Sequence, residues 1–333
     1  MSKVQISVSS ALPAVLFEPS WMSPDVSFYM SAPWLRYVHH ELTDEVFYLS
    51  AVLHGAVVAT LPIYPGQHGP RYTIGRFDPG LAAGRYAIGG GVSGYWSGVC
   101  WSSALDPKLR SEVLRRLIVE ARRHVAELGL DGLAMLYLPA SDLNLLSELG
   151  PHDSLDIALD AVLPFAFESF DEYLAWLPSR KRRQVKSDLA SMAGEDVVVT
   201  RHPLSDTIDE LAPMVSNVQR KYGIDDSPEA CYSGLTAQAR WLDALTHTFI
   251  ARNRHGEALG GALYYEYRNA LYGRLVGFAA NYPEKLYFQL YFYEPIRLAC
   301  QLSSTNMYFG LEGLQAKQKR GADVRHLAAV VFD

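Results

Sequence analysis

Three strand-like runs in quick succession constrain the fold of this 333-residue chain more than any other feature. Each run is rich in Ile, Leu, Val, Phe, Tyr or Thr, the residues that favour strands. The runs cover 248–253, 258–267 and 270–279. Only short turns at His255-Gly256 and Arg268-Asn269 separate them, and turns this short join neighbouring strands in antiparallel order. The sequence therefore predicts an antiparallel meander in the second half of the chain.

Helical patterns surround similar strand-like runs in the first half. A hairpin over 46–64 precedes a helix over 107–128, in which apolar residues recur at helical spacing. Asp106 and Pro107 suit the start of this helix, and Gly129 suits its end. The other predicted elements are helices over 31–40, 141–149, 170–193 with a break at Pro178, 208–222 and 286–302, a helical turn over 241–245, strands over 133–138, 154–163, 197–200 and 306–310, and an irregular basic end from 315.

Each half thus contains a meander that leads into a helix and then another strand, which predicts an α+β protein. A chain of this length suits two domains of roughly 150 residues each. We place the boundary near Pro164, which gives domains over 1–164 and 165–333.

The cysteines and the apolar runs indicate in which cellular compartment the protein is expected. The three cysteines are far apart and odd in number, so neither a disulfide framework nor a structural zinc site is expected. The N-terminus makes a poor signal peptide. The longest uncharged run, 47–64, reads as two strands and not as a membrane span. We expect a soluble, cytoplasmic protein.

A dense cationic block follows the break at Pro178. The chain is acidic as a whole, with 30 Lys and Arg against 36 Asp and Glu, yet residues 170–188 read FDEYLAWLPSRKRRQVKSD. The block contains Arg180, Lys181, Arg182, Arg183 and Lys186. It fits either a site for a polyanion or phosphate-bearing donor, or a solvated helix face.

Familiar catalytic motifs are absent or out of context. Gly89, Gly91 and Gly94 match GxGxxG, but the next predicted helix begins about a dozen residues later, so a tight turn is the better interpretation. The sequence contains no P-loop, HExxH, GxSxG or EF-hand pattern. His39 and His40 are adjacent and would point about 100° apart on a helix. We therefore expect no metal site and no hydrolase triad.

Three passages resemble the FemAB-like group of GNAT-fold acyltransferases, which includes the peptidoglycan-bridge aminoacyltransferases. They are the 170–188 passage, the meander HGEALGGALYYEYRNALYGRLVGFAA from His255, and YFQLYFYEPIRLACQLSSTNMYFGLEGLQAKQKRGA from Tyr287. RYAIGGG from Arg85 is similar to a "yGG" segment of the same proteins. The resemblance covers the chain from about Trp34 onward. It implies tandem GNAT-like domains, each a mainly antiparallel mixed sheet flanked by helices.

The resemblance also implies chemistry. Such enzymes transfer an acyl group from an activated ester or thioester to an amine, with no cofactor beyond the acyl donor itself. Ordinary GNAT proteins hold coenzyme A with [QR]xxGx[GA] at a strand-to-helix turn. Arg274, Gly277 and Ala279 match formally but lie within a predicted strand, and the helix start carries Leu286, Tyr287 and Phe288 in place of glycines. This favours an aminoacyl-tRNA donor, with acyl-CoA as the alternative.

Candidate site residues follow from the same resemblance. A donor-binding cationic surface would comprise Arg180, Lys181, Arg183 and Lys186, with Lys317, Lys319 and Arg320. Tyr287, Tyr291 and Phe292 would line an aminoacyl or adenosine pocket by stacking, or are buried core of an apolar helix. Candidates for proton transfer are Glu266, Glu294 and Glu312, with Tyr265 as a hydroxyl partner. Glu312 or Glu294 could instead be structural, paired with Arg297 or Lys319.

Two functions remain open at this stage. The first is an aminoacyltransferase or acyltransferase that forms an amide on a small-molecule amine, because the chain lacks the long helical arm that some bridge-forming members insert. The second is a non-catalytic RNA-binding or peptide-binding module on the same fold. The partners expected are tRNA and an amine acceptor.

Overall fold

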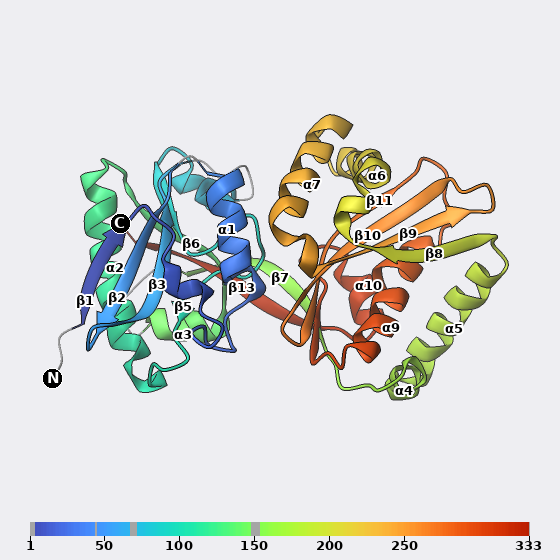
Figure 1. The fold of residues 1–333 in the computed structure, drawn as a ribbon, viewed down its shortest axis with the longest axis horizontal. Coiled ribbons are helices and arrows are strands. Elements are labelled where there is room, and N and C mark those ends of the chain that lie inside the picture. Colours follow the sequence, from blue (N-terminus) through green and yellow to red (C-terminus); the bar gives the residue numbers. More distant parts are fainter. Residues whose placement is uncertain (1–3, 44, 67–71, 148–153, 333) are drawn as a thin grey trace. The chain divides into compact units, whose positions relative to one another are not determined.

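The computed structural model describes residues 4–43, 45–66, 72–147 and 154–332 (Figure 1). The chain forms two compact units, one of Met1–Leu159 with Arg325–Asp333 and one of Asp160–Val324. The sequence-based ranges differ from this division in two places. The division falls five residues before Pro164, and the last nine residues lie in the first unit.

The first unit is a mixed sheet with strand order β1-β2-β3-β4-β6-β13. Its neighbouring strands are antiparallel, except that β4 and β6 are parallel. The strands are β1 Gln5–Ser9, β2 Phe47–Leu53, β3 Ala56–Tyr64, β4 Tyr86–Gly89, β5 Cys100–Trp101, which pairs with β3, β6 Gly132–Pro139 and β13 Asp323–Phe332. The helices are α1 Ala32–Glu41, α2 Arg110–Glu127 and α3 Ala140–Ser147.

The start and end of the long helix in this unit follow the sequence signals. Asp106 accepts a hydrogen bond from Lys108 N at 3.0 Å, and Pro107 opens a short 3₁₀ turn that leads into α2. Gly129 adopts the left-handed conformation directly after the helix, at φ +69°. The predicted helix 107–128 and the hairpin 46–64 are therefore confirmed.

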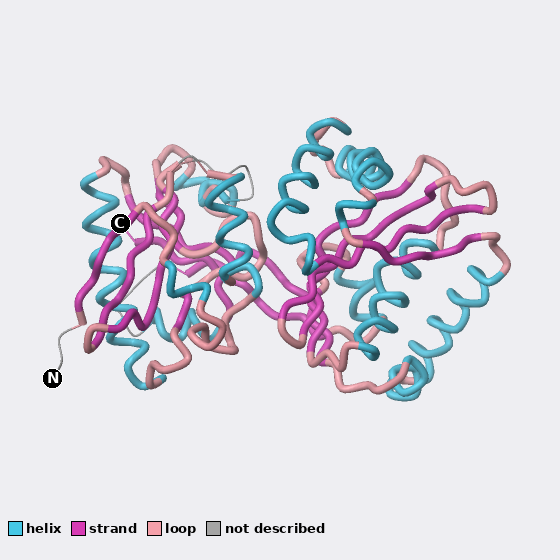
Figure 2. The backbone as a smooth tube through the Cα atoms, in the orientation of Figure 1, coloured by secondary structure: helices cyan, strands magenta, loops and turns pink. Residues whose placement is uncertain are grey.

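The second unit contains the meander and has strand order β7-β12-β11-β10-β9-β8. Figure 2 draws the strands of the chain in magenta. Its strands are β7 Ser154–Pro164, which enters this unit at Asp160, β8 Val197–His202, β9 Thr246–Asn253, β10 Ala258–Tyr267, β11 Ala270–Phe278 and β12 Asn306–Tyr308. Its helices are α4 Phe170–Trp176, α5 Ser179–Ala193, α6 Ile208–Lys221, α7 Pro228–Leu242, α8 Leu286–Phe288, a π-helical segment Gln289–Tyr293, α9 Glu294–Gln301 and α10 Leu314–Lys319. β9, β10 and β11 pair antiparallel, as predicted.

Two predictions for this half are wrong. The sequence predicted only a helical turn over 241–245, whereas α7 already begins at Pro228, with Ser227 capping it by accepting from Ala230 N at 3.2 Å. The end of the chain from 315 is not irregular, because it forms α10 and β13. β13 pairs with β6, a partner nearly 200 residues earlier, and a local pattern cannot reveal such a distant partner.

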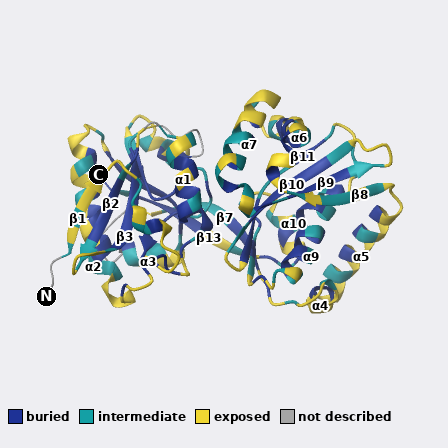
Figure 3. Ribbon diagram, in the orientation of Figure 1, coloured by how far each residue is buried: buried dark blue, intermediate teal, exposed yellow. Residues whose placement is uncertain are grey.

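Each unit buries its own apolar core, and Figure 3 shows the buried residues concentrated in the strands. In each unit a run of hydrogen-bonded, mainly antiparallel strands is flanked by helices, which is the tandem GNAT-like architecture that the sequence predicts. No helix within the described ranges combines the length and apolar character needed to cross a bilayer.

Gly277→Ala tests how closely α6 packs on β11. A Cβ at Gly277 would lie 2.6 Å from Val215 N and 2.7 Å from Met214 C, which are backbone atoms of α6. Because the helix itself would have to move, we expect the free energy of unfolding to fall by roughly 2 kcal/mol, measured by urea denaturation. Gly234→Ala on α7 is the matched control, since a Cβ there meets open space and should gain up to about 1 kcal/mol.

Candidate functional site

The two parallel strands of the second unit separate after three residue pairs. Their pairing ends at Tyr272 and Tyr308, whose rings stack with centroids 4.4 Å apart. β11 then continues along β10, whereas Phe309 and Gly310, which follow β12, hydrogen-bond with Ala161 of β7. We call the region between residues 273–278 and residues 309–310 the strand split. Its two backbone edges do not pair with each other, so other groups must satisfy them.

β11 carries a bulge beside the strand split. Its pairing with β10 shifts between Leu263 and Tyr264, which leaves Arg274 as the extra residue on β11. Bulges redirect side chains and frequently adjoin active sites. Arg274 is half-buried, and it is one of the residues that matched the coenzyme A motif formally.

Two side chains bond to the carbonyl groups on one edge of the strand split. Tyr291 Oη donates to Phe309 O at 2.7 Å, and Lys317 Nζ donates to Gly310 O at 2.7 Å. Tyr291 also reaches β11, because a Cβ on Gly273 would lie only 2.9 Å from Tyr291 Oη. Lys317 Nζ lies 5.9 Å from the centre of the Tyr291 ring. Tyr291 and Lys317 therefore meet where the strands diverge.

Lys317 is a buried cation, with 3% of its surface exposed. Burial lowers the pKa of its amine from 10.5 to about 8, although the nearby carboxylates of Asp160 and Glu312 act in the opposite direction. A depression of this size means that the charged amine is disfavoured by on the order of 3 kcal/mol relative to water. A buried amine whose pKa lies close to neutral pH is a candidate functional group.

The predicted cationic surface is only partly a surface. Arg180, Arg183 and Lys186 are exposed on α5, and Lys319 is exposed on α10. Lys181 donates to Gln318 O at 2.6 Å and thereby joins α5 to α10.

Two of the predicted surface cations are in fact buried. Arg320 is 2% exposed and donates to Asp188 at 2.6 Å, so it is a structural cation and not a surface phosphate ligand. Lys317 faces the strand split, and it likewise does not belong to the surface group. Burial of a long cationic side chain depends on its tertiary partners, which the sequence does not reveal.

The predicted aromatic pocket divides in a similar way. Phe292 is fully buried against Phe309, so it belongs to the core and lines no pocket. Tyr287 and Tyr291 stack with an interplanar angle of 16°. Tyr287 is half-buried, and burial raises the pKa of its phenol to about 12. A Cβ on Gly313 would lie 3.6 Å from Tyr287 Oη, so Tyr287 links the start of the helix after β11 to the segment after β12.

Among the predicted proton-transfer residues, Glu312 is exposed, and its charge raises the pKa of the Lys317 amine. Glu294 pairs with Arg297 at 2.9 Å and also bonds Gln289, so it has the structural pairing that the sequence left open.

Tyr265 and Glu266 each bond to a side chain that the sequence analysis did not single out. Tyr265 is fully buried and donates to Gln238 of α7 at 2.6 Å, so its hydroxyl is committed to packing. His247 Nε2 lies 2.8 Å from Glu266. Burial lowers the pKa of His247, and the bond to Glu266 opposes that effect.

The glycine-rich segment of the first unit forms a tight turn, as predicted, and not a nucleotide-binding loop. Gly91 N donates to Ser97 Oγ at 2.7 Å, and Ser97 N donates to Tyr137 O at 3.1 Å. A Cβ on Gly94 would collide with the Tyr29 ring. α2 starts only at Arg110, too late for a dinucleotide-binding helix terminus.

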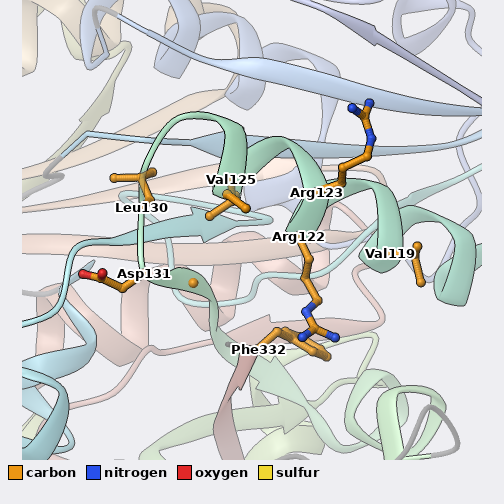
Figure 4. A pocket seen from close by; sticks show the side chains of 9 residues that line it. Val119, Arg122, Arg123, Val125, Leu130, Asp131 and Phe332 are labelled. Carbon is orange, nitrogen blue, oxygen red and sulfur yellow. The ribbon is translucent and has the colours of Figure 1, made fainter.

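The first unit also contains an open hollow of about 310 Å³ between α2 and the ends of β6 and β13 (Figure 4). Its lining includes the apolar residues Val125, Leu130 and Phe332 and the charged residues Arg122, Arg123 and Asp131. None of the predicted site residues lines this hollow. Within the described ranges, no cluster of three or more His, Cys, Asp or Glu residues could hold a metal ion.

Two residues of the candidate site escaped the sequence analysis. Asp160 lies in β7, almost 160 residues before Lys317 in the sequence, and its charge raises the pKa of the Lys317 amine. Tyr264 Oη donates to Tyr291 O at 2.6 Å and so fixes the backbone of the π-helical segment. A π segment often marks a functional site, but it has no sequence signature.

Comparison with solved structures defines the class of protein. The chain is similar to FemX, with a TM-score of 0.64 and 12% identity over 92% of each chain. It is also similar to a tandem GNAT protein from the clavulanic acid biosynthesis pathway, with a TM-score of 0.52 and 9% identity over 98% of each chain. The C-terminal domain of a putative lysylphosphatidylglycerol synthetase from Agrobacterium fabrum gives a TM-score of 0.54 at 12% identity, over 83% of this chain and 81% of that one. At these identities the likeness establishes the tandem GNAT fold alone.

The family follows from the sequence. The model of the FemAB-like family, described as peptidoglycan biosynthesis/recognition, matches residues 104–329. This match covers more than half of the chain, so the chain belongs to the FemAB-like family and is an acyltransferase. No curated protein matches the sequence.

The depressed pKa of Lys317 predicts a stability change with pH. Between pH 8 and 10.5 the native state holds fewer protons at this residue than the unfolded state, so its contribution to stability rises with pH. From pH 7.5 to 9.5 the wild type should gain about 2 kcal/mol relative to Lys317→Met, measured by denaturant unfolding. The control is Lys319→Met, an exposed neighbour, which should follow the wild type at both pH values. A constant difference between wild type and Lys317→Met would contradict the burial of a charged amine.

Proposed function

We propose that this protein transfers an aminoacyl group from aminoacyl-tRNA to the amine of a small-molecule acceptor and so forms an amide. The single observation that carries the proposal is the buried Lys317 amine at the strand split, 2.7 Å from Gly310 O. The membership in an acyltransferase family and the absence of glycines at the start of α8 support the same conclusion.

Lys317 suits charge stabilisation in acyl transfer. When an amine attacks an ester carbonyl, the carbonyl oxygen gains negative charge in the transition state. A protonated Lys317 in this low-dielectric position would attract that charge far more strongly than a solvated lysine could. Glu312, exposed and close enough to act on Lys317, is the proposed acceptor of the amine proton. The new bond joins the amine nitrogen to the acyl carbon, and the ester C–O bond breaks. The proton that Glu312 accepted then passes to the departing sugar oxygen, which leaves as a hydroxyl.

The choice of donor rests on the occupied edge of the strand split. A pantetheine arm inserted between two separated strands needs free backbone groups to pair with. Tyr291 and Lys317 already bond to the carbonyl groups of Phe309 and Gly310. The bulky residues Leu286, Tyr287 and Phe288 also stand where a pyrophosphate would need close backbone approach. An aminoacyl ester that presents only its terminal acyl group avoids both obstacles.

The exposed cations of α5 supply the second support for an RNA donor. No ion pair involves Arg180, Arg183 or Lys186 in the part of the chain that the structure describes. Exposed, unneutralised cations on one helix suit the phosphates of a nucleic acid. Trp176 ends the preceding helix and is 51% exposed, so an aromatic face is available for base stacking near the start of α5.

The proposed acceptor is a small molecule that carries an amine. A small-molecule amine is favoured because the longest described helix, α2, has 18 residues and no long helical arm appears within the described ranges. The family description makes a peptidoglycan precursor the competing acceptor. An acyl-CoA donor and a non-catalytic RNA-binding or peptide-binding module are the alternatives to the whole proposal.

One assay separates these possibilities. The protein is incubated with charged tRNA and a panel of amines, including a peptidoglycan precursor, with and without RNase, and in parallel with acyl-CoA. We expect amide formation that RNase abolishes. Formation that needs a CoA thioester and ignores RNase would exclude the tRNA donor, and RNA binding without transfer would favour the non-catalytic module.

Lys317→Met should lower kcat by roughly 100- to 1000-fold, because a preorganised charge facing the reacting carbonyl would be lost. Gly310 O keeps its bond from Ala161 N at 3.3 Å, so the fold should persist in this variant. Steady-state kinetics with charged tRNA provide the measurement, and Lys108→Met, at an exposed lysine of the first unit, is the control. Normal turnover by Lys317→Met would remove this residue from the mechanism.

The triple variant Arg180→Ala, Arg183→Ala, Lys186→Ala should bind tRNA of any sequence more weakly than the wild type. Its affinity should also depend less on salt concentration. Each lost phosphate contact should reduce the slope of log K against log salt by about 1. Filter binding between 50 and 200 mM salt measures this slope. The control removes three exposed cations from the first unit, Lys108, Arg115 and Arg116, and should leave the slope unchanged.

A further inference from the structure

Asp188 and Arg320 form a buried ion pair that the candidate mechanism does not use. Arg320 Nη2 donates to Asp188 Oδ2 at 2.6 Å, and the two side chains are 3% and 0% exposed. Tyr293 donates to the same carboxylate oxygen at 2.6 Å, and Gln184 donates to the other one at 3.0 Å. The guanidinium also lies 3.7 Å from the centre of the Phe288 ring. The pair therefore joins α5, the helix that contains the π segment, and the end of α10.

Such a pair adds little net stability. Removing two charges from water offsets most of their attraction, so well-packed apolar residues often replace a buried pair without loss. The pair does fix geometry, because a planar guanidinium donates its hydrogen bonds only in set directions. Here Arg320 has three of them: Asp188, Tyr293 Oη at 3.2 Å and Ala316 O at 3.0 Å.

The element that Arg320 anchors is the one that carries Lys317. α10 has six residues, too few to be stable as an isolated helix. Arg320 N donates to Lys317 O at 2.9 Å, and Ala316, the residue before Lys317, accepts from the Arg320 guanidinium. Tyr173 Oη adds a bond to Arg320 O at 3.0 Å. Movement at Arg320 must therefore displace Lys317.

We propose that Asp188 and Arg320 are positioning residues, which hold α10 so that the Lys317 amine lies at the strand split. The inference deepens the proposed function and rests on it for the catalytic consequence. Asp188 lies on α5, the helix that also presents Arg180, Arg183 and Lys186 to solvent. The same helix thus carries the proposed donor-binding cations on one face and the anchor of α10 on another.

Two variants separate positioning from folding. Tyr293→Phe removes one bond each from Asp188 and Arg320 and keeps the ring. The double variant Asp188→Leu, Arg320→Met replaces the pair by apolar side chains, and thermal unfolding should find it folded. We expect kcat to fall roughly 10- to 100-fold in the double variant and less in Tyr293→Phe, with KM within about threefold of the wild type. The matched control is Glu210→Gln, which breaks the Arg252–Glu210 pair of the same unit, and it should change neither constant.

A second measurement needs no acyl donor. NMR titration of protein with isotope-labelled lysine, with the Lys317 signal assigned by its loss in Lys317→Met, follows the amine directly. In the wild type it should titrate near pH 8, under the influence of Asp160 and Glu312. In the double variant the midpoint should move toward the ordinary value of a solvated lysine, because water reaches the amine.

The outcomes are distinct. A double variant with wild-type kcat and an unchanged Lys317 midpoint would reduce the pair to a structural role and overturn the proposal. A shifted midpoint in the double variant, together with no acyl transfer by the wild type, would leave the positioning intact and instead reject the proposed function.

Discussion

Backbone pairing between β11 and β12 stops after Tyr272 and Tyr308, and the chemistry proposed for this protein follows from that divergence. Strand edges that separate inside a folded unit leave polar backbone groups in need of partners. Here the Tyr291 phenol bonds to Phe309 O, and the Lys317 amine bonds to Gly310 O, which also accepts from Ala161 N of β7. The amine therefore lies in a poorly solvated place that lowers its pKa. The strand split thus surrounds an amine with a depressed pKa, and the described ranges contain no cluster of His, Cys, Asp or Glu that could hold a metal ion.

The buried network around Arg320 and the exposed cations of α5 belong together physically. One face of α5 buries Val185, Asp188 and Met192, and another exposes its arginines and lysines to solvent. The helix therefore separates two kinds of positive charge. Arg320 is desolvated and committed to Asp188, whereas the cations at the surface keep their hydration and can exchange it for phosphate.

Local patterns were sufficient for part of this structure. The meander and the helix capped at Asp106 follow from turn residues and periodicity that lie within a few positions of each other. The burial of Lys317 and Arg320 could not be predicted, because a basic run near a chain end looks the same whether it is solvated or paired with a distant Asp188. The effect of Glu312 on the pKa of Lys317 could be predicted, because the two residues are close in sequence, whereas the effect of the distant Asp160 could not.

The last strand of the chain has a consequence for biosynthesis. β13 completes the sheet of the first unit by pairing with β6, so that unit consists of two segments separated by the whole of the second unit. A ribosome releases the residues of β6 long before those of β13. The edge of β6 must therefore wait for its partner while the intervening unit emerges, and during that interval the exposed edge is open to chaperones or to aggregation.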